Sequence, residues 1–180
     1  MPNVFLSPST QEYNQFVNGG TEEYYANLIA DAMVPYLRAS GIDFSRNNPG
    51  GTVTDSIASS NEGNYDFHLA IHSNAAPPNL SGAIQGPDVY YYRDSAAGRR
   101  DAEIIANNLR QIYPDPSLVT VVPTTTLAEV RRTKAPTVLV EVAYHDNVED
   151  ANWIKNNVGA IGRNLALSVA DIVGVPFVEA

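Results

Sequence analysis

The chain of 180 residues contains no cysteine. This absence excludes thiolate zinc sites, cysteine nucleophiles and disulfides. Any metal would have to be bound by His, Asp, Glu or neutral oxygen ligands. Because cysteine-free chains are compatible with either redox compartment, the absence gives no cellular location.

Long apolar runs and basic patches are also lacking. No stretch approaches the roughly 20 apolar residues that a membrane-spanning helix needs. The N-terminal MPNVFLSPSTQ lacks the basic and apolar regions of a signal peptide. We therefore expect no membrane span, and export only by another route or through a leader outside this sequence. The formal net charge of −9 argues against a nucleic-acid surface.

What is present is a globular composition, 44% hydrophobic and 17% charged, in which strand and helix patterns alternate. The patterns predict strands over 3–6, 42–46, 65–71, 88–93 and 137–142, and helices over 22–40, 52–60, 95–112, 148–157 and 159–172. Pro35 predicts a kink or a broken final turn in the first helix. We expect one domain over residues 1–180, an α/β fold whose mostly parallel, twisted sheet is flanked by helices on both faces. Ligands bind such sheets at the carboxyl ends of the strands.

Two of the three histidines lie in DFHLAIHSNA, residues 66–75. The segment has the character of a strand, on which His68 and His72 share a face about 13 Å apart at roughly 3.3 Å per residue. One small metal ion cannot bind both. His72 lies at the strand end, before Ser73 and Asn74. It is either part of a functional site or a histidine without a functional role. We expect His68, between apolar residues, to pack in the core.

Glu141 ends the apolar strand of TVLVEVAYHDN. A carboxylate there is costly to bury without a partner or a task. It could act as a general base toward a metal-activated water, or it could form a structural ion pair with Arg131, Arg132 or Lys134. His145 is either an exposed loop residue or a group that positions substrate.

The first predicted helix begins with an acidic pair, Glu22 and Glu23. Acidic residues at this place complement the helix dipole without any further function.

Together these segments resemble the zinc-dependent N-acetylmuramoyl-L-alanine amidases (type 3) of bacteria and phage. Glu23, with Asn27 and the following leucine, fits the glutamate and Asn-Leu pair of that family's first helix. AIHSNA matches its strand with His72 as a ligand, and GPDVYYY matches its next strand. LAEVRRTKAPTVLVEVAYHDN matches its last block, with Glu141 at the catalytic glutamate and Asn147 at the closing asparagine.

The resemblance implies a Zn²⁺ ion held by His, Glu and His. It also implies hydrolysis of the amide between N-acetylmuramic acid and L-alanine of the peptidoglycan stem peptide, with Glu141 moving the proton. Substrate contacts are expected from Asn74, Arg131 and His145. The implied partner is peptidoglycan or a muropeptide, and the implied location is the cell wall or the extracellular space.

One ligand of that pattern is missing. The family has its first histidine in the loop after strand one, where this chain reads SPSTQEYN. Spacing puts Thr10 or Gln11 at the ligand position, with Glu12 adjacent. Gln11 or Glu12 could complete the site, a weaker or different metal could bind, or metal and activity could be lost. His145 could replace the imidazole from another loop.

The loss of metal would leave a wall-binding or regulatory module with the amidase fold. A further alternative is a metal-dependent hydrolase of another amide.

Overall fold

Six strands form one sheet in the order β2-β1-β3-β6-β4-β5. The computed structural model describes all residues, 1–180. The strands are β1 (Asn3–Pro8), β2 (Asp43–Arg46), β3 (Phe67–Asn74), β4 (Asp88–Tyr92), β5 (Thr120–Thr124) and β6 (Thr137–Tyr144). Only the β4–β6 pair is antiparallel. The predicted α/β fold with a mostly parallel sheet is therefore confirmed.

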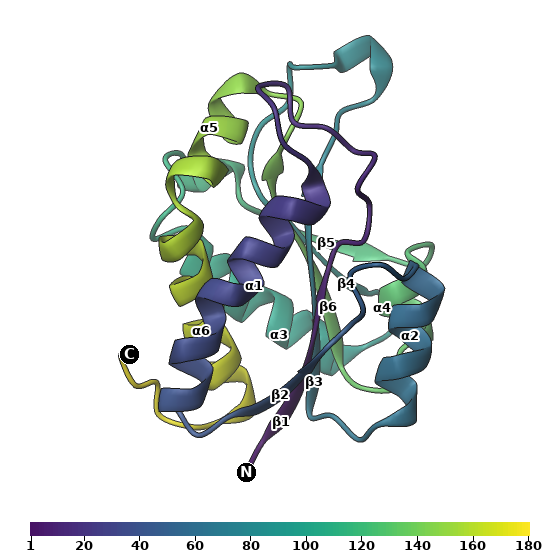
Figure 1. The fold of residues 1–180 in the computed structure, drawn as a ribbon, viewed down its shortest axis with the longest axis vertical. Coiled ribbons are helices and arrows are strands. Elements are labelled where there is room, and N and C mark those ends of the chain that lie inside the picture. Colours follow the sequence, from purple (N-terminus) through teal and green to yellow (C-terminus); the bar gives the residue numbers. More distant parts are fainter.

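Helices cover both faces of this sheet (Figure 1). They are α1 (Glu22–Ala39), α2 (Val53–Glu62), α3 (Ala96–Leu109), α4 (Ala128–Arg132), α5 (Val148–Asn156) and α6 (Val158–Val173), with short 3₁₀ turns at Pro78–Leu80 and Pro116–Leu118. Helices α1, α3, α5 and α6 lie on one side, and α2 and α4 on the other. No helix combines the length and the apolar character needed to cross a membrane.

Alternation along the strands decides which side chains meet which helices. Leu69 and Ile71 of β3 belong to the large core under α1 and α6. Ala70 instead packs with Leu139 of β6 and Val130 of α4 in a smaller cluster on the opposite face. His68 and His72 are in phase with Ala70, so they point toward α2 and α4.

All the predicted helices and strands are present, with ends displaced by a few residues. Helix α1 runs through Pro35 to Ala39 without a break. Strand β5 and helix α4 were not predicted. Strand β5 contains Pro123, which cannot donate to a ladder and is tolerated because β5 is an edge strand.

Helices α1 and α6 approach closely because Gly162 has no side chain. A Cβ atom at this position would lie 2.5 Å from Cβ of Ala32. We expect Gly162→Val to lower the free energy of unfolding by about 2 kcal/mol. Gly159→Val in the same helix is the control, since nothing lies within 4 Å of its Cβ position. Urea unfolding measures both, and equal stability of the two variants would contradict the close-packing argument.

The strand register brings the functional candidates into one row. Pro8 at the end of β1 pairs with Ile71, and the next residue of β3, His72, pairs with Glu141 of β6. Glu141 in turn pairs with Asp88 of β4. The row lies at the carboxyl end of β3, where the register shifts between His72 and Asn74.

Candidate active site

His72 is the centre of this site, and both of its ring nitrogens face carboxylates. Nδ1 lies 2.9 Å from Oε1 of Glu22, and Nε2 lies 3.7 Å from Oε2 of Glu129. Burial disfavours the charged ring, but the contacts with the carboxylates of Glu129 and Glu22 and the negative charge of Glu141 outweigh it. The pKa of His72 is therefore raised well above its ordinary value.

Glu22 comes from the first turn of α1. The hydroxyl of Thr21 caps this helix by accepting from the backbone N–H of Tyr24. The Glu22 side chain is only 2% exposed, and Asn14 Nδ2 donates to its Oε2 at 2.7 Å. Burial alone would raise its pKa, but the hydrogen bond and charge of His72 and the Asn14 contact lower it overall.

Glu23, the residue that sequence comparison assigned as the ligand, does not contact His72. Its Oε1 accepts from Asn27 Nδ2 at 3.1 Å, one turn along the same helix. Successive helical residues point about 100° apart, so only one of the acidic pair can face the sheet edge. In the structure Glu22, and not the expected Glu23, faces His72.

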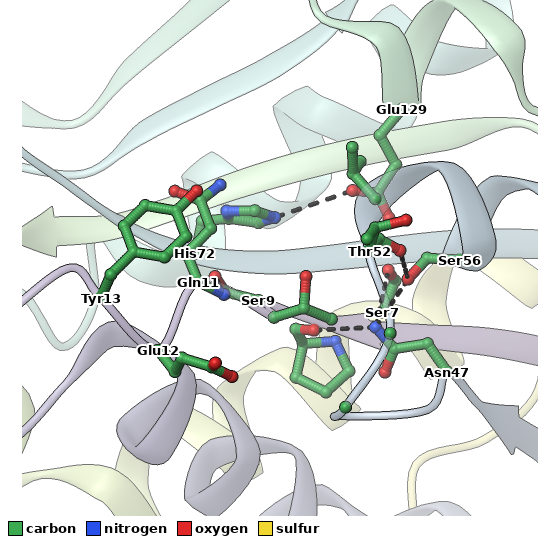
Figure 2. Close-up of a pocket in the computed structure, with 15 residues that line it drawn as sticks. Ser7, Ser9, Gln11, Glu12, Tyr13, Asn47, Thr52, Ser56, His72 and Glu129 are labelled. Atoms are coloured by element: carbon green, nitrogen blue, oxygen red, sulfur yellow. Dashed lines mark hydrogen bonds and ion pairs between the residues drawn. The ribbon is translucent and has the colours of Figure 1, made fainter.

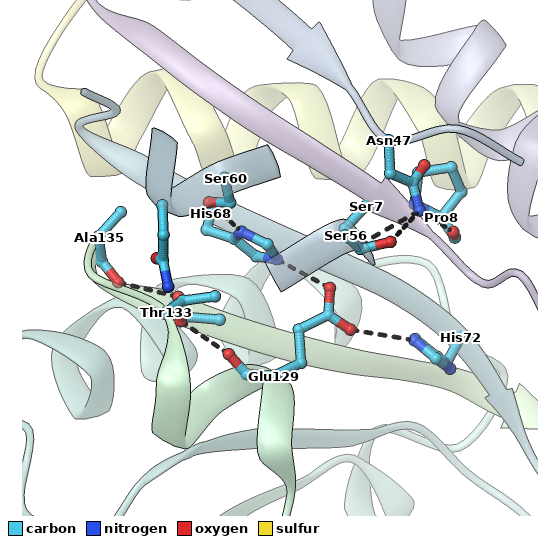
Figure 3. A network of polar contacts seen from close by, with 12 residues as sticks. Ser7, Pro8, Asn47, Ser56, Ser60, His68, His72, Glu129, Thr133 and Ala135 are labelled. Atoms are coloured by element: carbon cyan, nitrogen blue, oxygen red, sulfur yellow. Dashed lines mark hydrogen bonds and ion pairs between the residues drawn. The ribbon is translucent and has the colours of Figure 1, made fainter. Parts of the chain in front are cut away.

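Glu129 was not singled out from sequence, although it lies within the block that resembles the amidases. It is 3% exposed, and its Oε1 accepts from His68 Nε2 at 2.9 Å (Figure 3). Burial opposes its ionisation, yet the hydrogen bonds and charges of His68 and His72 lower its pKa to about 2. No periodic signal marks it, because it belongs to the five-residue helix α4.

His68 is fully buried, as expected, and it is also part of a polar chain. Its Nδ1 lies 2.8 Å from the Ser60 hydroxyl of α2. Its ring stacks on Phe5 with centroids 5.2 Å apart. Glu129 therefore connects two histidines that are too far apart to share a small metal ion.

Glu141 is partly buried and forms no ion pair with a cationic side chain. Its Oε2 has no hydrogen-bond partner in the protein. Arg131, Arg132 and Lys134 are exposed and form no ion pair with it, so the structural ion-pair alternative is not what the structure shows. Burial, together with the charges of Glu22 and Asp88, outweighs the attraction of His72 and raises the pKa of Glu141 to about 7.

A second polar group adjoins Glu141 on the β4 side. Asp88 accepts hydrogen bonds from the Tyr144 hydroxyl at 3.0 Å and from Asn74 Nδ2 at 3.3 Å. Burial raises the pKa of Asp88, although both hydrogen bonds oppose this shift. Asn74, an expected substrate contact, thus lies beside the row of candidate residues.

The loop that follows β1 forms one wall of a polar pocket of about 370 Å³ (Figure 2). Thr10, Gln11, Glu12, His72 and Glu129 all line it. Oε1 of Gln11 accepts from Asn14 Nδ2 at 2.6 Å, and the same amide group contacts Glu22. Gln11 is thereby connected to the His72–Glu22 pair, whereas the carboxylate of Glu12 is exposed and has no such connection.

His145 and Arg131 are not brought to His72. Nδ1 of His145 lies 2.8 Å from the hydroxyl of Ser73, whose side chain alternates to the face opposite His72. The His145 ring is 4% exposed and stacks on Phe16. Burial lowers its pKa. Of the alternatives for His145, an exposed loop position is therefore wrong, and its ring does not face His72. Arg131 is exposed on α4.

Comparison with known proteins identifies the family of this chain. The family model described as N-acetylmuramoyl-L-alanine amidase matches residues 9–171. The chain belongs to this family. A search of curated protein sequences gives no match.

Solved structures of amidases share the fold. The N-acetylmuramoyl-L-alanine amidase AmiC2 of Nostoc punctiforme superposes with a TM-score of 0.84 at 16% identity, covering 96% of this chain and 97% of that one. The catalytic domain of CwlV from Bacillus (Paenibacillus) polymyxa gives 0.83 at 15% identity, covering 98% and 100%. Ami1 from Mycobacterium smegmatis gives 0.80 at 17% identity, covering 96% and 97%.

The zinc ion implied by this family can be tested against the donors present. No group of three or more His, Asp or Glu side chains is placed to hold a metal. His72 Nδ1 and Glu22 Oε1, 2.9 Å apart, are close enough to bind one ion at about 2.0–2.2 Å each. A carbonyl oxygen has two lone pairs, so Gln11 can accept from Asn14 and still bind a cation. His72 and Glu22 suit zinc, and Gln11, connected to Glu22 through Asn14, is the neutral oxygen that could supply a third donor.

Proposed function

We propose that the protein is a metal-dependent peptidoglycan amidase, which hydrolyses the amide between N-acetylmuramic acid and L-alanine. One observation carries the proposal: Glu141, whose enclosed Oε2 has no hydrogen-bond partner, is the register partner of His72, whose Nδ1 faces Glu22. A histidine–carboxylate pair beside an unpaired carboxylate provides two metal ligands and a base. Membership of the amidase family supports the substrate class.

In this proposal the metal ligands are His72, Glu22 and Gln11. Glu22 takes the role that sequence comparison gave to Glu23. The neutral amide of Gln11 stands in for an imidazole, and an amide oxygen is a harder and weaker zinc donor. We therefore expect zinc to be held less tightly than by a His-Glu-His set.

A bound zinc ion would polarise the amide carbonyl and activate the attacking water. Glu141 accepts a proton from this water and passes it to the nitrogen of the departing L-alanine. A group with a pKa of about 7 is suited to both steps near neutral pH, because it can exist in either form. Substrate enters the polar pocket beside His72, whose wall includes the hydroxyl and amide groups of Ser9, Thr10, Asn47 and Thr52. Such neutral polar groups suit a sugar or peptide ligand.

A second candidate is a wall-binding protein that does not cleave. The direct hydrogen bond between His72 and Glu22, and the neutral third donor, favour it. In this case the pocket would still accept peptidoglycan fragments.

The proposal is tested by digestion of purified peptidoglycan with protein that has been stripped of metal and reloaded with zinc. Mass spectrometry should detect stem peptides with a free L-alanine amino terminus only in the zinc-loaded sample. His72→Ala should release none. Zinc binding followed by cleavage elsewhere in peptidoglycan would contradict the assigned bond, and absence of zinc binding would contradict the metal-dependent function.

The two candidate functions are separated by co-sedimentation with insoluble peptidoglycan. A protein that sediments with peptidoglycan but releases no peptide at any zinc concentration is the non-cleaving wall binder. A protein that neither sediments nor cleaves contradicts both.

A further inference from the structure

A buried polar chain ends beside Nε2 of His72 (Figure 3), whereas Glu22 faces Nδ1 of the same ring. It begins at Ser60 on α2, passes through His68 on β3, and ends at Glu129 on α4. All three side chains are at most 3% exposed. Neither the family match nor the proposed reaction accounts for these residues.

The geometry of the chain fixes where the ring protons lie. The Glu129 carboxylate offers acceptor oxygens, so His68 Nε2, 2.9 Å from its Oε1, is the donor of this pair. Nδ1 of His68 lies 2.8 Å from the Ser60 hydroxyl, which can donate or accept. The second oxygen of Glu129 remains free to face Nε2 of His72 at 3.7 Å.

A metal-binding histidine commonly gives its other ring N–H to a carboxylate, which selects the tautomer and orients the ring. Glu129 lies where such a carboxylate is needed, since it faces Nε2 while Glu22 faces Nδ1. His68 in turn holds Glu129, and its stacking on Phe5 prevents it from turning away.

We infer that Ser60, His68 and Glu129 form a positioning chain that holds the Nε2 proton of His72 toward Glu129 and so presents Nδ1 to the metal. This inference rests on the proposed function, because it needs His72 to be a metal ligand. The three residues do not touch substrate or metal. They act through the orientation of His72.

The test is zinc affinity, measured by calorimetry on metal-stripped full-length protein. His68→Leu removes the donor to Glu129, and we expect the Kd for zinc to rise by about 10-fold or more. His68→Gln is the matched variant, since a glutamine amide can reach the place of imidazole Nε2 and donate to Glu129. We expect its Kd to stay close to that of the wild type.

A second readout does not depend on zinc. The chain has only three histidines, so the ring ¹⁵N–¹H signals of metal-free protein are few, and His145 serves as the reference. The Nε2 proton of His72 should exchange slowly with water in the wild type and in His68→Gln, and rapidly in His68→Leu. If His68→Leu does not fold, Ser60→Ala, which removes only the far hydroxyl, should change both readouts in the same direction.

The outcomes separate this inference from the proposed function. Failure of the wild type to bind zinc overturns the proposed function, and this inference with it. Zinc binding with equal affinity in the wild type and a folded His68→Leu variant overturns the positioning chain alone. So does an unchanged exchange rate of the His72 Nε2 proton in that variant.

Discussion

Glu141→Gln should reduce the rate of amide hydrolysis by on the order of 10³-fold, because it removes the general base and leaves the shape of the site unchanged. Zinc affinity should change little, since Glu141 is not among the proposed ligands. The measurement is release of stem peptide from purified peptidoglycan at saturating zinc. Glu62→Gln, at an exposed carboxylate on α2, is the control and should cleave like the wild type. Wild-type cleavage by Glu141→Gln would remove Glu141 from the mechanism.

The same substitution should stabilise the metal-free protein at neutral and alkaline pH. In the folded state the pKa of Glu141 is about 7, against 4.5 for the ordinary side chain. Below pH 4.5 both folded and unfolded states carry the proton, so the wild type has no penalty. As pH rises toward 7 the unfolded state ionises first, and the wild type loses stability relative to the Gln variant.

The difference should reach about 3–4 kcal/mol above pH 7, because each unit of pKa shift corresponds to about 1.4 kcal/mol. Urea unfolding with a chelator present, at pH 4 and pH 8, measures it. A constant difference between the variants at both pH values would show that Glu141 is not buried as a costly charge.

Glu129→Ala should lower the free energy of unfolding by about 3–5 kcal/mol at pH 7, the usual cost of breaking a buried charged pair from one side. The substitution leaves His68 Nε2 without its acceptor inside the core, and it removes a carboxylate from His72. Glu103→Ala is the control, because that residue only forms an exposed i,i+4 pair with Arg99, worth at most about 0.5 kcal/mol.

The cost of Glu129→Ala should depend on pH in the opposite sense to that of Glu141→Gln. The folded-state pKa of Glu129 is about 2, below the ordinary 4.5, so its stabilising contribution is complete above pH 4.5. This contribution is lost as pH falls toward 2. Urea unfolding of the wild type and Glu129→Ala between pH 7 and pH 3 should show the two stabilities converging. A loss that is constant over this range would mean that packing, not charge, makes Glu129 important.

The sequence by itself determined the fold class and two members of the candidate site. Alternating strand and helix patterns are local properties, so they predict a layered sheet without knowledge of the partners. His72 and Glu141 were found because each ends an apolar strand, and parallel strands bring their carboxyl ends to one edge. The separate roles of His68 and His72 also followed from local geometry, since a strand places them about 13 Å apart.

Only the tertiary structure decided which acidic residue of α1 faces His72. Glu22 and Glu23 are both glutamates in the first turn, so the sequence does not distinguish them. Which one faces His72 depends on the rotation of α1 about its axis. The Thr21 cap and the packing of α1 on α6 together set this rotation. The contacts of Glu129 and Ser60 with His68 also depend on the packing of α4 and α2 over β3. Both residues lie on other elements than His68, and Glu129 is far from it in the sequence. For His145 the sequence left open an exposed loop position or a substrate contact, whereas in the structure its buried ring stacks on Phe16. Contacts between distant segments leave no periodic signal in the sequence, and for this chain they decide which carboxylates surround His72.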